Sequence, residues 1–119
     1  MIRFTGGGPR KAARESGLSI HIRVPEPSGS LSSWRPAVLH RDDRGLVVET
    51  IKGEHRAFVL GATEMVAERR VEGPDRLRLE TAILTHSKAG SIEFGFHDDE
   101  VLDEALDLLG LPPRRSTAD

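Results

Sequence analysis

The feature that most constrains this fold is a series of short alternating apolar and polar segments, closed by one acidic amphipathic helix. Alternation with a period of two indicates strands that bury one face. The segments that show it are 19–24, 37–41, 45–51, 56–60, 64–71, 76–83 and 92–96. The connections between them are too short for crossover helices, so we expect antiparallel pairing.

Two turns predict hairpins within this series. Asp42-Asp43-Arg44-Gly45 separates the second and third segments, and Gly45 can take the positive φ that such a turn requires. Lys88-Ala89-Gly90 separates the last two segments in the same way. A helical turn is also possible at 64–71. Because Gly61 and Gly73 leave room for only a short helix, we interpret the segment as a strand.

The one strong helical signal covers 98–109. Acids in its first turn favour the positive end of the helix dipole, and Gly110 with the following prolines ends the helix. The apolar positions at helical spacing are Val101, Leu102, Ala105, Leu106 and Leu109.

Composition narrows the class of protein further. A chain of 119 residues forms one domain, and we expect a flexible leader at 1–17, the folded domain at 18–111 and a tail at 112–119. The absence of cysteine excludes disulfides, thiolate zinc sites and a cysteine nucleophile. No stretch approaches the ~18 apolar residues of a membrane span, so we predict a cytoplasmic protein. Arginine outnumbers lysine fourteen to three, which suggests a bacterial source.

Seven candidate strands followed by one C-terminal amphipathic helix resemble the pleckstrin-homology (PH) superfold, in particular the small bacterial PH-like domains. The resemblance covers roughly 18–111 and rests on element order and on 91–109, where a last strand runs into the helix. It implies a mainly β (α+β) fold, a bent antiparallel seven-stranded barrel or sandwich whose open end the helix caps. PH domains usually carry a tryptophan in that helix, and those that bind phosphoinositides carry a basic cluster across the first two strands. In this chain the only tryptophan, Trp34, precedes the helix, and no residue from Val24 to Trp34 is basic.

The resemblance implies a non-enzymatic interaction module that binds a protein or peptide partner by a strand edge, a helix groove or the loop 25–35. A second copy of the chain is a further candidate partner. Trp34 is the first candidate contact, because exposed tryptophans are enriched at binding hot spots; the alternative is that it plugs the barrel mouth. The other candidate contacts are Arg23, Arg35, Arg69 and Arg70. For Arg69 and Arg70 the alternative is that they lie on the solvated face of a strand.

A second hypothesis is a small enzyme or ligand-binding barrel. Its polar cleft would be formed by His40, Glu49, His55 and Arg56. Such sites are concave and hold groups with shifted pKa values. An open cavity with two or more of these side chains turned inward would favour this hypothesis, whereas a filled barrel would favour the module.

Several kinds of site find no support in the sequence. The histidines lack the short spacings of metal ligands, so we expect no metal, no cofactor and no assigned catalytic residue. Six acids lie between Asp98 and Asp107 with no base among them, a surface that repels nucleic acid and anionic membranes. We therefore expect no nucleic-acid partner and little affinity for membranes.

Overall fold

The computed structural model describes residues 17–24, 33–71 and 77–113. The predicted leader and tail fall outside these ranges except for Gly17, Pro112 and Pro113, and most of the loop 25–35 also lies outside them. Within the described residues, no helix is long and apolar enough to cross a membrane.

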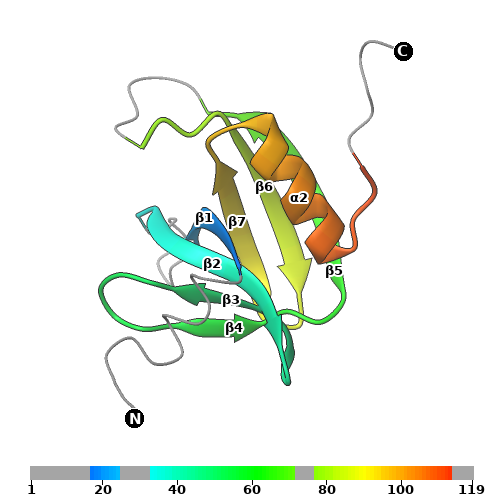
Figure 1. Cartoon of the computed structure of the whole chain (residues 1–119). Helices are drawn as coiled ribbons and strands as arrows, with labels where there is room; N and C mark the ends of the chain where they lie inside the picture. The colour runs from blue at the N-terminus through cyan, green and yellow to red at the C-terminus, as the bar shows by residue number, and fades with distance from the viewer. Residues whose placement is uncertain (1–16, 25–32, 72–76, 114–119) are drawn as a thin grey trace.

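Seven antiparallel strands form one sheet, as the alternation predicts. Their order is β4-β3-β2-β1-β7-β6-β5, so β1 pairs with both β2 and β7 and joins the two halves of the sheet. Figure 1 shows the sheet bent, with the β2–β4 half turned across the β5–β7 half. The strands are β1 (Leu18–Arg23), β2 (Arg35–Asp42), β3 (Gly45–Thr50), β4 (Ala57–Val59), β5 (Thr63–Arg70), β6 (Thr81–Ser87) and β7 (Gly90–Phe96).

Both predicted hairpin turns are present. Asp42 pairs with Gly45, and Ser87 pairs with Gly90, so each loop contains two residues. Gly45 has φ 107° and Gly90 has φ 98°, values that side chains with a Cβ rarely adopt. The two glycines therefore fix where each hairpin turns.

The strand predicted at 76–83 is shifted toward the C-terminus. β6 runs over Thr81–Ser87, and residues 77–80 precede it without strand structure. The physical reason is at Arg78, whose φ of 56° is left-handed and interrupts the extended backbone. The alternation of Leu77 and Leu79 therefore does not reflect a strand, although Leu79 is buried.

Segment 64–71 is a strand, as predicted, and it contains a bulge. β5 pairs with β6 in a register that shifts between Met65 and Ala67, which leaves Val66 as the extra residue. A bulge of this kind bends a strand and locally disrupts its pairing. β5 is a terminal strand of the sheet, and β4 is the other.

Among the residues that the structure describes, one helix, α2 (Asp99–Leu109), caps the sheet, which confirms the predicted mainly β fold with a C-terminal helix. The Asp98 carboxylate accepts a hydrogen bond of 2.9 Å from the Val101 N–H, and Gly110 ends the helix with φ 72°. The helix packs against β1, β2 and β7. Its buried residues Leu102, Ala105, Leu106 and Leu109 join a core with Ile20, Ile22, Leu39, Val48, Ile83, Ile92, Phe94 and Phe96.

Replacing Leu106 with aspartate tests whether this helix face is essential to the core. Leu106 is 1% exposed, so Leu106→Asp buries an unpaired carboxylate and should lower the free energy of unfolding by about 4 kcal/mol or more. Chemical denaturation followed by circular dichroism measures the loss. Val66→Asp makes a similar apolar-to-acidic change at a residue that is 59% exposed, and it should cost less than about 1 kcal/mol. Equal losses in the two variants would contradict this account.

Candidate functional site

A buried carboxylate organises the outer face of the sheet. Glu93 lies in β7 between Ile92 and Phe94, which face the core, so its side chain points to the opposite face. Arg23 Nε donates to Glu93 Oε1 over 2.7 Å, and Arg69 Nε donates to Oε2 over 3.0 Å. Glu93 is 5% exposed, whereas the side chains of Arg23 and Arg69 are 22% and 45% exposed, so both ion pairs run from a buried carboxylate to the edge of solvent. Two predicted contact arginines are therefore held by an acid of the same chain.

Trp34 packs beside these ion pairs. The Arg23 guanidinium carbon lies 4.5 Å from the centre of the Trp34 ring, in a cation–π arrangement. The ring also rests against Gly95, where a Cβ would come within 2.9 Å of Trp34 Cζ3 and 2.8 Å of Leu79 Cδ1. Trp34 thus has a packing role on the outer face of β7, while the half-buried residue keeps part of its surface in solvent.

The Glu93 carboxylate is held in its ionised form. Burial favours the neutral form and raises its pKa, but hydrogen bonds from Arg69 and Arg23 and their positive charges more than offset that effect. The net result is a pKa below the usual range for a glutamate.

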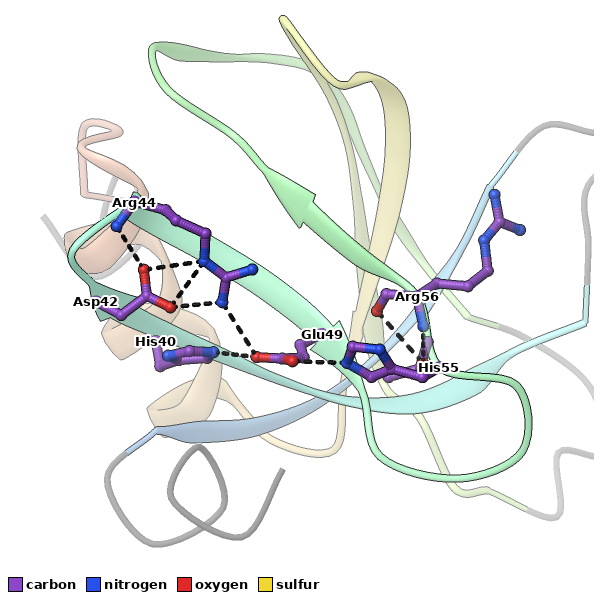
Figure 2. Close-up of polar contacts among 7 residues, drawn as sticks. His40, Asp42, Arg44, Glu49, His55 and Arg56 are labelled. Atoms are coloured by element: carbon purple, nitrogen blue, oxygen red, sulfur yellow. Dashed lines mark hydrogen bonds and ion pairs between the residues drawn. The ribbon is translucent and has the colours of Figure 1, made fainter. Parts of the chain in front are cut away.

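A second buried carboxylate lies on β3 and is shown in Figure 2. Glu49 Oε1 lies 2.7 Å from His40 Nε2, and Glu49 Oε2 lies 2.7 Å from His55 Nε2. Because a carboxylate only accepts hydrogen bonds, each imidazole donates its Nε2 hydrogen. Arg44 Nη2 lies 3.7 Å from Oε1 and also forms an ion pair with Asp42. Glu49 is 2% exposed, so its negative charge is compensated from within the protein.

Glu49 is also acidic relative to an ordinary glutamate. Burial raises its pKa, but the hydrogen bonds from His55 and His40 more than offset that effect, and the net pKa is lowered. Since both carboxylate oxygens already accept hydrogen bonds, this group is well suited to hold the neighbouring strands and loop in place.

Three of the four residues proposed for a polar cleft therefore meet, and the fourth does not. In Figure 2 the Arg56 side chain points away from Glu49, and its guanidinium carbon lies 5.3 Å from the centre of the Phe58 ring. Arg56 lines a pocket of about 200 Å³, whereas His40 lines a separate groove of about 440 Å³ beside α2. Together with Arg56, the smaller pocket is lined by Ile22, Arg23, Val24, Arg35, Thr50, Glu54 and Phe58.

The remaining predicted contacts are separated from one another. Arg35 lines the 200 Å³ pocket, and Arg70 is exposed at the end of β5. Sequence reasoning missed Glu93, the residue that brings Arg23 and Arg69 together. The alternation around it places Glu93 on the polar face of a strand, and nothing in that pattern indicates that the face is buried.

The edge of the sheet at β5 carries a different kind of site. Val66 is a large apolar residue that is 59% exposed, and it lies on a terminal strand. A groove of about 560 Å³ runs between β5 and the end of α2. Its lining residues are Thr63, Glu64, Met65, Glu68, Gly110, Leu111, Pro112 and Pro113.

Comparisons with protein-family models, with curated proteins and with solved structures found no match to this chain. Among the residues that the structure describes, no group of three or more histidine, aspartate or glutamate side chains is placed to hold a metal ion. The sheet edge, the grooves and the two buried carboxylates are therefore the features of this chain that bear on its function.

Adding a methyl group at Gly95 tests the packing of Trp34. Gly95→Ala should displace the Trp34 and Leu79 side chains, cost about 1–3 kcal/mol and shift the emission of Trp34, the only tryptophan, to longer wavelength. Fluorescence spectra and denaturation curves measure both effects. Ser91→Ala, a control on the same strand, should change neither. An unshifted Gly95→Ala spectrum would show that Trp34 does not rest on this glycine.

Acid titration tests the two buried carboxylates. Their pKa values are lowered in the folded protein, so the stabilisation that the ionised carboxylates give to the folded state is complete at neutral pH. It declines once the pH falls below about 4.3, the unfolded value, and is lost as the pH passes through the folded value. Urea denaturation between pH 7 and pH 3 should show this decline in the wild type. Glu93→Gln should lower stability at pH 7 by about 1–3 kcal/mol and flatten the decline, and an unchanged slope would contradict this assignment.

Proposed function

We propose that this protein is a non-enzymatic, cytosolic PH-like interaction module that binds an extended segment of a protein partner along β5. The observation that carries the proposal is the β5 edge itself. β5 is an eight-residue terminal strand with an exposed apolar residue, Val66, and a groove beside it.

The backbone of a terminal strand supports this mode of binding. An edge strand presents N–H and C=O groups that another extended segment can pair with, and neighbouring pockets then select its side chains. The other terminal strand, β4, has only three residues. The longer β5 edge, with the adjoining groove, therefore offers more hydrogen bonds and more apolar contact.

The order of elements supports the PH-like part of the proposal. Seven antiparallel strands followed by one capping helix is the arrangement that the resemblance implies. The pocket at Arg56 contains one of the four residues that the enzyme hypothesis needs, and both carboxylate oxygens of Glu49 already accept hydrogen bonds from His40 and His55. These contacts favour a module over a reaction centre.

Peptide selection followed by NMR mapping tests the proposed edge. A phage-displayed random dodecapeptide library is selected on the full chain, and the best peptide is synthesised and titrated into ¹⁵N-labelled protein. We expect the largest shifts in β5 and at Gly110 to Pro113. Val66→Lys should weaken binding about tenfold or more, because lysine on an edge strand blocks strand addition.

Ser19→Lys adds the same charge at an exposed position of β1 and serves as the control. It should leave the affinity within about twofold of wild type. Shifts confined to β4 or to the face around Trp34, or a selection that yields no binding peptide, would overturn the proposed function.

Lipid and DNA binding provide a contrasting test. We expect little affinity for phosphoinositide vesicles or duplex DNA at about 150 mM salt, where charges act over only about 8 Å. Glu93 offsets one of the two positive charges of Arg23 and Arg69, and Glu54 lines the same pocket as Arg23, Arg35 and Arg56. Vesicle sedimentation and gel-shift assays measure this directly. Micromolar binding that disappears when Arg23 and Arg35, or Arg69 and Arg70, are changed to alanine would contradict the protein-partner proposal.

A further inference from the structure

We infer that the partner segment at β5 is a basic peptide with an apolar anchor, an inference that rests on the proposed function and specifies its ligand. The groove beside β5 combines apolar walls with acidic side chains. The apolar part selects an anchor side chain, and the acidic part selects the charge next to it.

The apolar walls come from both sides of the groove. Met65 of β5 is half-buried against the core, and Leu111 packs against the same core from the chain that follows α2. Pro112 and Pro113 extend this wall. An aliphatic side chain of the partner could therefore cover apolar surface here.

The charged part of the lining is entirely acidic. Glu64 and Glu68 both line the groove, and no lysine or arginine lines it. Both glutamates are exposed, and neither forms an ion pair with another described residue. By contrast, Glu49 and Glu93 are held by internal partners. The groove carboxylates are therefore available to a ligand.

The helix end adds to the negative potential. α2 ends at Leu109 beside Gly110, and its last turn contains no basic residue. The carbonyl end of a helix carries a partial negative charge that attracts cations. On the β2 side of the helix end, Arg41 Nη2 donates a hydrogen bond of 3.1 Å to the Leu108 carbonyl oxygen. On the groove side, none of the lining residues is a lysine or an arginine. A lysine or arginine of the partner fits this position.

The sequences of selected peptides test the charge class. We expect peptides that bind at β5 to be enriched in lysine or arginine beside an aliphatic residue. Changing those bases to glutamate in the best peptide should weaken binding about threefold to tenfold, and the difference should shrink as salt is raised. Fluorescence anisotropy with labelled peptides measures both effects.

Charge reversal in the protein provides the matched test. Glu64→Lys with Glu68→Lys should remove the preference for the basic peptide and favour its acidic version. Glu100→Lys with Glu104→Lys makes the same change in net charge on the exposed side of α2 and should leave the preference in place. Melting curves test whether both double variants fold. If the Glu64→Lys and Glu68→Lys double variant does not fold, the milder Glu64→Gln with Glu68→Gln takes its place.

The outcomes separate this inference from the function on which it rests. Peptides that map to β5 without basic enrichment, or whose binding ignores charge reversal, would overturn the inference and leave the proposed function standing. If no peptide maps to β5, or if sedimentation shows that a second copy of the chain occupies the edge, both would be overturned.

Discussion

The double pairing of β1 is the constraint on which the other features depend. β1 hydrogen-bonds to β2 on one side and to β7 on the other, so a six-residue strand joins the two halves of the sheet. Its inward residues Ile20 and Ile22 enter the core that α2 closes. Its outward residue Arg23 reaches Glu93 and stacks on Trp34. The capped core and the polar cluster on the outer face therefore share one strand.

The two buried glutamates show why charged residues in strands are poor evidence of a binding surface. Each satisfies both of its oxygens with groups from other parts of the chain, Glu93 through Arg23 and Arg69 and Glu49 through two histidines. A buried charge is tolerated only when it is compensated in this way. The cations that look available in the sequence are thus partly committed to holding strands together, whereas the acids beside β5 are not.

Much of the architecture could be predicted from the sequence, because it depends on local signals. Alternation predicted the strands, Gly45 and Gly90 predicted the hairpin turns, and helical spacing predicted α2. The start of β6 was predicted wrongly, since the left-handed φ of Arg78 has no signature in an alternating segment. The site was harder to predict, because the contacts of Glu93 link residues up to 70 positions apart and depend on strand register.

The bulge at Val66 has a consequence for chain length. Met65 lies opposite Thr85 and Glu68 lies opposite Ile83, so two residues three positions apart share one face of β5. In a regular strand they would point in opposite directions. Deleting Val66 would place Met65 and Glu68 two positions apart in a regular strand, so Glu68 would stay opposite Ile83, Arg69 would stay opposite Ala82, and neither residue would change face. The bulge therefore takes up one residue of chain length, and a deletion at Val66 would remove the exposed apolar side chain while leaving Glu68 at the groove and Arg69 beside Glu93.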